Sequence, residues 1–233
     1  MAGAESAWCV VPAAGRGARF GAERPKQYVT LAGQTLLIWT LQRLAVCPVV
    51  AGLMVVLAAD DTYWPQIGSL AGKPVLTSVG AGERSGSVLA GLRALPSTVT
   101  DDAFVFVHDA ARPCVRCADI SRLFQHGVAA GGGLLAAPLR DTLKLGDGDS
   151  RVVATEPREA RWRALTPQLF RRGELTDALS RAEVDGIAIT DEAMAMERCG
   201  HRPLLVEGAE SNIKVTTAAD VALAAYLLSI TND

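Results

Sequence analysis

Short, continuous apolar runs alternate with helix-length segments through the first part of this chain, and that alternation limits the folds it can adopt. Runs rich in Val, Leu or Phe occur at Trp8–Pro12, Leu53–Ala58, Pro74–Val79, Phe104–His108 and Leu134–Pro138. Segments with helical spacing lie between them, at Thr35–Val46, Asp61–Leu70, Ser85–Leu95 and Ala118–Ala129. A continuous apolar run suits a strand that is buried on both faces, as in a parallel sheet. The alternation therefore predicts an α/β fold with a doubly wound, mostly parallel sheet.

The pattern changes after Pro138. Two short strand-like segments, Thr142–Leu145 and Arg151–Thr155, flank the turn sequence GDGDS and predict a β-hairpin. We expect an arm inserted at about residues 139–160 of one domain that spans residues 1–233. An isolated hairpin is marginally stable in water, so we expect the arm to pack against something, such as a second subunit. Beyond the arm, the sequence predicts helices at Pro167–Ala182, Asp191–Cys199 and Ala218–Ile230, and strands at Leu204–Val206 and Ile213–Val215.

Composition excludes several functional classes. Hydrophobic residues make up 49% of the 233 residues and charged residues 21%, which rules out a disordered chain. A net charge of −2 provides no basic field for nucleic acid or for a membrane surface. The N-terminus has no basic region, and the longest apolar run is too short to cross a bilayer. Five cysteines, an odd number, do not form a disulfide framework. These features together predict a soluble, cytoplasmic protein.

A glycine-rich turn follows the first predicted strand, in the sequence VVPAAGRGARFGAERPKQY that begins at Val10. Glycines such as Gly15 and Gly17 let backbone N–H groups approach a ligand, and consecutive N–H groups form an anion-binding concavity. Arg19 and Lys26 add positive charge. The glycine spacing is neither that of a dinucleotide-binding motif nor that of a Walker A loop. The turn is either an ordinary surface turn with solvated cations or a site for a polyphosphate, which needs several converging cations.

The segment VPAAGRGARFGAERPKQY resembles the opening motif of the 2-C-methyl-D-erythritol 4-phosphate cytidylyltransferases of the non-mevalonate isoprenoid pathway. Further family motifs follow in order, as GERSGSVLAGL from Gly82, VHDAARP from Val107, RDTLK from Arg140, LTPQ from Leu165, TDE from Thr190 and NIKVT from Asn212. Together the motifs cover nearly the whole chain. The resemblance implies a Rossmann-like nucleotidyltransferase fold. It also implies that CTP and 2-C-methyl-D-erythritol 4-phosphate react to give 4-diphosphocytidyl-2-C-methyl-D-erythritol and pyrophosphate.

The resemblance also implies roles for individual residues in an in-line attack of the substrate phosphate on the α-phosphorus of CTP. The implied catalytic residues are Arg19, Lys26, Lys214 and Arg158. The implied CTP contacts are Ala13, Ala14, Gly15, Gly17, Gly82, Ser87 and Asp109. The implied contacts to the polyol phosphate are Arg112, Thr142, Arg158 and Thr166. The family further implies Mg²⁺ held mainly by the CTP phosphates, with no dedicated protein metal site, and a homodimer whose arm completes the neighbour's site.

Other interpretations compete with this one. The sequence is also similar, in its PKQ and NIKVT segments, to ribitol 5-phosphate cytidylyltransferases, although those usually open with LAGG. A non-catalytic nucleotide-binding regulator on the same fold is a further alternative. The order Gly80-Ala81-Gly82 departs from the paired glycines that are frequent in the first family.

Several polar residues also have structural interpretations. We expect His108 to be a buried structural residue rather than a base. For Asp191 and Glu192 we favour a role at a helix N-terminus, and Arg84 is as plausible in a structural ion pair as in function. Cys114 and Cys117 have the spacing of a metal or redox motif, but no second pair accompanies them.

Overall fold

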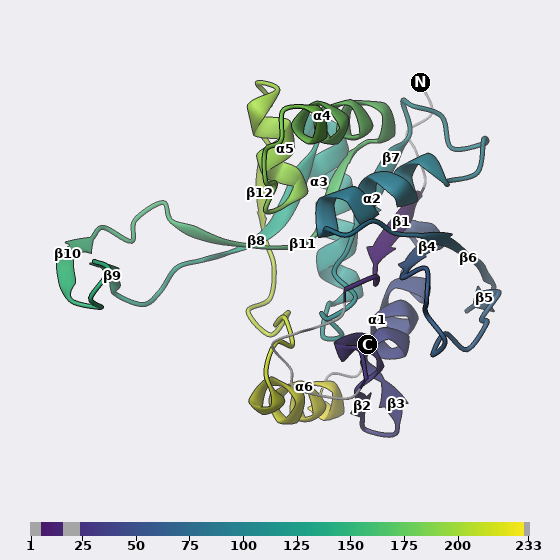
Figure 1. The fold of residues 1–233 in the computed structure, drawn as a ribbon, viewed down its shortest axis with the longest axis horizontal. Helices are drawn as coiled ribbons and strands as arrows, with labels where there is room; N and C mark the ends of the chain where they lie inside the picture. Colours follow the sequence, from purple (N-terminus) through teal and green to yellow (C-terminus); the bar gives the residue numbers. More distant parts are fainter. Residues whose placement is uncertain (1–5, 16–23, 231–233) are drawn as a thin grey trace.

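The computed structural model describes residues 6–15 and 24–230, and an eight-stranded sheet forms its centre (Figure 1). The strand order is β12-β8-β11-β7-β1-β4-β6-β5. The strands span β1 Ala7–Pro12, β4 Val50–Leu57, β5 Ser69–Leu70, β6 Lys73–Val79, β7 Phe104–Val107, β8 Gly133–Pro138, β11 Trp162–Arg171 and β12 Leu204–Glu207. β1 pairs in parallel with β4 and β7, β4 with β6, and β8 with β12, whereas β11 runs antiparallel to β7 and β8. The prediction of a mostly parallel α/β sheet is confirmed.

The central strands are buried on both faces because their side chains alternate between two cores. In β1, Cys9 and Val11 face one core and Val10 faces the other. Helices α1 (Leu36–Ala45) and α3 (Cys117–Ala130) cover the first core. Helices α2 (Arg84–Arg93), α4 (Arg172–Val184) and α5 (Glu192–Arg198) cover the second. This two-sided burial is what the continuous apolar runs indicate.

Smaller elements complete the chain. The 3₁₀ turn η2 spans Lys26–Tyr28 and is followed by a short hairpin of β2, Thr30–Leu31, and β3, Gln34–Thr35. Helix α6, Ala218–Ile230, packs near this hairpin. Within the described residues, no helix has the length and apolar character that a bilayer-spanning segment needs.

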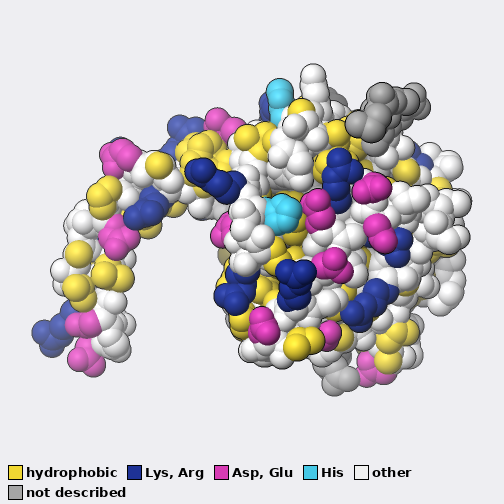
Figure 2. Space-filling model, turned by 90° about the horizontal axis from the view of Figure 1, so that it is seen from above, with side chains coloured by type: hydrophobic (Ala, Val, Ile, Leu, Met, Phe, Trp, Pro, Cys, Tyr) yellow, Lys and Arg dark blue, Asp and Glu magenta, His cyan; other side chains and the backbone are white. Residues whose placement is uncertain are grey.

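The predicted hairpin projects from the rest of the molecule as an arm (Figures 1 and 2). Its strands, β9 (Leu143–Gly146) and β10 (Val152–Glu156), form a separate two-stranded antiparallel sheet. Val152 and Val153 are 65% and 61% exposed, although β-branched apolar residues of this kind are usually covered. The arm therefore presents apolar side chains to its surroundings.

Two predicted elements are wrong, and a third begins later than predicted. No helix forms at Asp61–Leu70, because the Asp61 carboxylate accepts hydrogen bonds from the backbone N–H groups of Tyr63 and Trp64, which makes a turn. The helix predicted from Pro167 begins only at Arg172, since residues 167–171 belong to β11. Residues 213–215 form no strand. The Val215 N–H donates to the Ala111 carbonyl and the segment packs irregularly against the loop after β7.

Candidate active site

Two adjoining cavities lie at the carboxyl ends of the central strands. The first, of about 210 Å³, is bounded by the segments that follow β1, β6 and β7, together with Lys26 and Lys214. The second, of about 250 Å³, is lined by residues that include Arg112, Thr166 and Thr190. Arg84, Asp109 and Lys214 line both cavities and so form the wall between them. This edge of a parallel sheet is where ligands bind in folds of this class.

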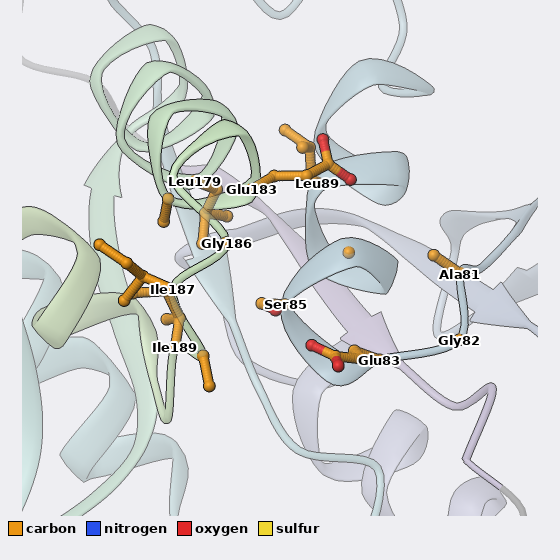
Figure 3. Close-up of a pocket in the computed structure, with 13 residues that line it drawn as sticks. Ala81, Gly82, Glu83, Ser85, Leu89, Leu179, Glu183, Gly186, Ile187 and Ile189 are labelled. Carbon is orange, nitrogen blue, oxygen red and sulfur yellow. The ribbon is translucent and has the colours of Figure 1, made fainter.

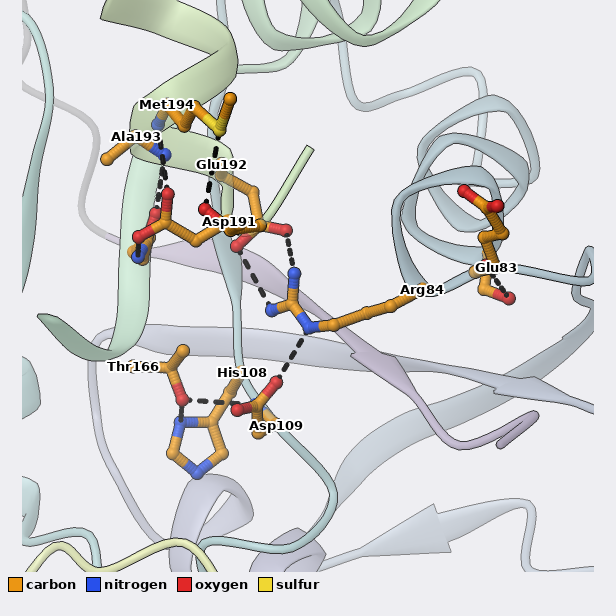
Figure 4. A network of polar contacts seen from close by, with 12 residues as sticks. Glu83, Arg84, His108, Asp109, Thr166, Asp191, Glu192, Ala193 and Met194 are labelled. Atoms are coloured by element: carbon orange, nitrogen blue, oxygen red, sulfur yellow. Dashed lines mark hydrogen bonds and ion pairs between the residues drawn. The ribbon is translucent and has the colours of Figure 1, made fainter. Parts of the chain in front are cut away.

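Asp109, directly after β7 and His108, has cations on both carboxylate oxygens. Oδ1 accepts a hydrogen bond from Arg84 Nε at 2.9 Å (Figure 4). Oδ2 lies 2.9 Å from Lys214 Nζ and 3.4 Å from Arg112 Nε. Burial alone raises the pKa of Asp109, but the charges of Arg84, Lys214 and Arg112 outweigh it and hold that pKa well below its ordinary value. Asp109 is therefore a carboxylate throughout the neutral range.

Arg84, in the first turn of α2, connects Asp109 to a second carboxylate. Its Nη1 donates to Glu192 Oε1 at 2.6 Å and its Nη2 to Glu192 Oε2 at 3.2 Å (Figure 4). Glu192, in the first turn of α5, is fully buried. Burial lowers the pKa of Arg84, but the two carboxylates outweigh burial and raise it.

Thr166 and His108 hold the backbone of Asp109. The Thr166 hydroxyl oxygen accepts from the Asp109 N–H at 3.1 Å and lies 3.0 Å from His108 Nδ1 (Figure 4). His108 Nε2 lies 3.1 Å from the Arg112 carbonyl, which can only accept. This pattern requires an Nε2–H imidazole with Nδ1 accepting from Thr166. Burial lowers the pKa of His108 to about 4, so the ring is neutral.

Asn212 bonds to two segments that line the second cavity. Its side-chain amide donates to the Thr166 carbonyl at 2.7 Å, and its own carbonyl accepts from Arg112 Nη1 at 2.7 Å. Asn212 is fully buried and stands two residues before Lys214. It therefore connects the Lys214 segment with the loops that carry Arg112 and Thr166.

Backbone groups shape the first cavity. The Gln27 amide donates to the Ala13 carbonyl at 2.6 Å and holds the turn after β1. Ser87 Oγ accepts from the Ala81 N–H at 3.1 Å, so its hydroxyl fixes the loop before α2. A Cβ at Gly80 would lie 2.7 Å from the side chains of both Ala14 and Ser87, which explains the glycine there. The two loops are thus packed against each other.

A third cavity, of about 400 Å³, lies between α2 and the end of α4 (Figure 3). Its wall is apolar at Leu89, Leu179 and Ile187, and it carries the carboxylates of Glu83 and Glu183. Glu83 also lines the first cavity, but Lys26, Arg84 and Lys214 supply positive charge there, whereas no lysine or arginine is among the described residues that line the third cavity. The third cavity is larger but does not suit a phosphate ligand.

The structure brings together most of the residues singled out in the sequence. Lining the first cavity are Ala13, Ala14, Gly15, Lys26, Gly82, Ser87, Asp109 and Lys214. Lining the second are Arg112 and Thr166, again with Asp109 and Lys214. Gly17 and Arg19 lie outside the described residues. Thr142 and Arg158 lie on the arm and do not line either cavity in the part of the chain that is described, and Arg158 donates to the Arg140 carbonyl.

Sequence reasoning missed the roles of Gln27, Asn212 and Glu192. Gln27 and Asn212 stand inside the PKQ and NIKVT segments, so their position beside Lys26 and Lys214 was a usable signal. Glu192 also stands inside a family motif, TDE from Thr190, but a glutamate in the first turn of a helix is equally favoured by the helix dipole, so the motif did not single it out. That interpretation holds for Asp191, whose carboxylate caps α5 by accepting from the Met194 N–H at 3.0 Å.

Comparisons with known proteins give one consistent result. The sequence model of the 2-C-methyl-D-erythritol 4-phosphate cytidylyltransferase family matches residues 7–230. A protein of that name from Stenotrophomonas maltophilia strain R551-3 is 59% identical over 223 residues, 95% of this chain and 96% of the relative. One from Xanthomonas campestris pv. campestris strain 8004 is 57% identical over 93% of this chain and 82% of its own length.

Solved structures agree with the sequence relatives. A crystal structure of a 4-diphosphocytidyl-2C-methyl-D-erythritol synthase superposes with a TM-score of 0.83 at 33% identity, over 96% of this chain and 99% of that one. The Francisella tularensis 2-C-methyl-D-erythritol 4-phosphate cytidylyltransferase superposes with a TM-score of 0.81 at 32% identity, over 95% and 99%.

Proposed function

Because this chain belongs to the 2-C-methyl-D-erythritol 4-phosphate cytidylyltransferase family, we propose that its first cavity binds CTP and its second binds the polyol phosphate. The chain is a nucleotidyltransferase that joins CTP and 2-C-methyl-D-erythritol 4-phosphate and releases pyrophosphate. Two adjoining cavities with a shared charged wall suit this reaction, in which two anionic substrates must meet at one phosphorus atom.

The observation that carries the proposal is that Lys26 and Lys214 line one cavity although they are far apart in the sequence. A nucleoside triphosphate brings about four negative charges, and each cation about 4 Å away contributes roughly 4 kcal/mol before desolvation at an effective dielectric of about 20. Lys26 and Lys214 hold the triphosphate, and Arg19 of the glycine-rich turn adds a third cation. Ala13, Ala14 and Gly15 line the first cavity, and we assign nucleotide contacts to their backbone and, from the sequence motif alone, to Gly17.

The chemistry requires alignment rather than proton transfer. A phosphate oxygen of the polyol substrate is already anionic at neutral pH, so it attacks the α-phosphorus of CTP in line without a general base. His108 would make a poor base, since both ring nitrogens are engaged and it is fully buried. Lys26 and Lys214 stabilise the charge that develops as pyrophosphate leaves.

Recognition of cytosine relies on the backbone lining of the first cavity. The loops after β1 and β6 line it with small residues such as Ala14 and Gly82, so backbone groups can approach the base. The space beside Gly82 is unoccupied by protein atoms, because a Cβ there would meet no atom within 4 Å. Ser87 contributes by holding the loop after β6. Its hydroxyl is nearly inaccessible, so its part in base recognition is to shape the cavity.

Mg²⁺ fits a site where phosphate oxygens supply most ligands, because this ion dehydrates reluctantly and keeps few protein ligands. Asp109 is the carboxylate on the wall shared by both cavities, and it would lie near the ion while Arg84, Arg112 and Lys214 contact its two oxygens and the CTP phosphates supply the ligands. The bound metal would neutralise phosphate charge during transfer.

We further propose one domain over residues 1–233, a homodimer formed through the arm at about 139–160, and a cytoplasmic location. The exposed apolar side chains of the arm support pairing with a second copy. In such a dimer, Arg158 and Thr142 of the arm reach the partner's second cavity, where Arg112 and Thr166 bind the same substrate phosphate. All five cysteines are free thiols, as a reducing compartment allows.

The test is pyrophosphate release by the purified protein with CTP and Mg²⁺, and with either 2-C-methyl-D-erythritol 4-phosphate or ribitol 5-phosphate. We expect turnover with the first substrate. Turnover with ribitol 5-phosphate alone would replace the proposed substrate. CTP binding without turnover on either would support a regulator.

A further inference from the structure

Glu192 carries a charge at a position that has no access to water. Its residue exposure is 0%, and both of its carboxylate oxygens accept hydrogen bonds from Arg84, at 2.6 and 3.2 Å. A buried carboxylate is costly unless it is paired and hydrogen-bonded, and the bidentate arginine fork is the geometry that pairs it best. The pair joins the first turn of α2 to the first turn of α5.

The same guanidinium makes a third contact, to Asp109. Arg84 uses both Nη groups on Glu192, which leaves Nε for Asp109 Oδ1 at 2.9 Å (Figure 4). The planar fork is rigid, so fixing two of its corners also fixes the direction of the third. Asp109 Oδ1 is therefore held on the α2 side, and Oδ2 is left for Lys214 at 2.9 Å.

We propose that Glu192 is a positioning residue that acts through Arg84 on Asp109 and Lys214. This inference rests on the proposed function, in which Lys214 holds the triphosphate and Asp109 lines the cavity that binds CTP. Glu192 sets the orientation of Arg84, Arg84 sets the rotation of the Asp109 carboxylate, and the carboxylate sets the position of the Lys214 ammonium. Without the Glu192 carboxylate, Arg84 no longer has a fixed orientation and the Asp109 carboxylate can rotate. Lys214 is then no longer held at the wall between the cavities.

Two purely structural roles for Glu192, capping of α5 and stabilisation of the fold, explain its buried contacts less well. The N-terminus of α5 is already capped by Asp191, so α5 does not need Glu192 for that purpose. Stability also does not require an ion pair here, because a buried pair replaced by apolar residues of similar volume is often neutral or stabilising. A purely structural pair can therefore be replaced without loss of activity, and a positioning pair cannot.

The test compares the wild-type protein with the double variant Arg84→Met/Glu192→Leu, and with Arg93→Met as a matched control at the exposed end of α2. We expect the double variant to fold with a lowered melting temperature, because Arg84→Met also removes a cation from the buried Asp109 carboxylate, and kcat is therefore measured well below that temperature. We expect kcat to fall tenfold or more while the Kd for CTP changes by less than about fivefold, since most of the nucleotide contacts do not depend on the pair. A double variant with the wild-type kcat would overturn the inference.

A double-mutant cycle then asks whether Glu192 acts through Arg84. Glu192→Gln is expected to lower kcat in the wild-type background and not to lower it further in the Arg84→Met background, where its route to Asp109 is gone and the substitution removes an unpaired buried charge. Equal effects of Glu192→Gln in both backgrounds would contradict the inference. A wild-type protein that releases no pyrophosphate overturns the proposed function and this inference with it, whereas an active wild type with an equally active double variant overturns the inference alone.

Discussion

The Lys214 ammonium lies 2.9 Å from Oδ2 of Asp109. Asp109 follows β7 in the middle of the sheet, and Lys214 comes from the irregular segment before α6. The backbone bond from the Val215 N–H to the Ala111 carbonyl and the Asn212 contacts hold this segment against the loop after β7. An irregular segment thus brings Lys214, which is far from Lys26 in the sequence, to the same cavity at the carboxyl ends of the strands.

Lys26→Ala is expected to lose roughly 3–4 kcal/mol of transition-state stabilisation, similar to the loss of one oxyanion donor. The physical reason is that the triphosphate loses one of the cations that stabilise the leaving pyrophosphate. The measurement is steady-state pyrophosphate release, with the exposed Arg93→Ala as a control for general loss of positive charge. A kcat within about threefold of the wild-type value would contradict this role for Lys26.

Mixing Arg158→Ala with Lys26→Ala tests whether the arm completes the neighbour's site. Each variant alone should be nearly inactive. If Arg158 acts on the partner, a heterodimer holds one site with an intact Lys26 and an intact Arg158, so random re-assembly restores about a quarter of the wild-type activity. The measurement is activity after co-refolding or co-expression. No recovery, with heterodimers shown to be present, would place Arg158 in its own subunit's site or outside the site.

The stability of the fold is expected to fall as the pH is lowered from about 6.5 to 4. His108 has its pKa lowered to about 4 by burial, and in the unfolded chain the same group has its ordinary value near 6.5. In this window the unfolded state binds more protons, so the free energy of unfolding drops by up to roughly 3 kcal/mol. Urea unfolding at several pH values measures the slope. His108→Gln should flatten it, and an unchanged slope would rule out His108 as the cause.

Thr166→Val should destabilise the protein by about 1–3 kcal/mol, because the buried Asp109 N–H and His108 Nδ1 both lose their partner. Thr166→Ser keeps the hydroxyl and serves as the matched control. The readout is the midpoint of urea unfolding at pH 7. Equal midpoints for the Val and Ser variants would show that these two hydrogen bonds contribute little.

The sequence predicted the parallel part of the sheet well and its antiparallel part poorly. Continuous apolar runs identify β1, β4, β7 and β8, because each is apolar enough to be recognised without its neighbours, whereas β6 has a shorter apolar stretch and buries only Val75. β11 was partly assigned to a helix, since its residues 167–171 run directly into α4 with no turn residue between them. Its strand conformation is set by pairing with β7 and β8, which no local pattern displays.

For the candidate site, the sequence alone identified the segments that carry a characteristic local motif. It did not identify residue pairs that only tertiary contact brings together. The glycine-rich turn, Lys26 and Lys214 stand out through residue type and motif. The Arg84–Glu192 ion pair joins two helix starts that are distant in the chain, so its partners cannot be matched from one sequence. The same limit applies to Asn212, whose importance lies in bonds to Thr166 and Arg112.

The central claim is that Lys26 and Lys214 converge on one triphosphate, and a crystal structure with CTP and Mg²⁺ tests it most directly. We predict that both ammonium nitrogens lie within hydrogen-bond distance of phosphate oxygens, with the cytosine against the loops at Ala14 and Gly82. A nucleotide bound elsewhere, or a triphosphate that contacts neither lysine, would contradict the account.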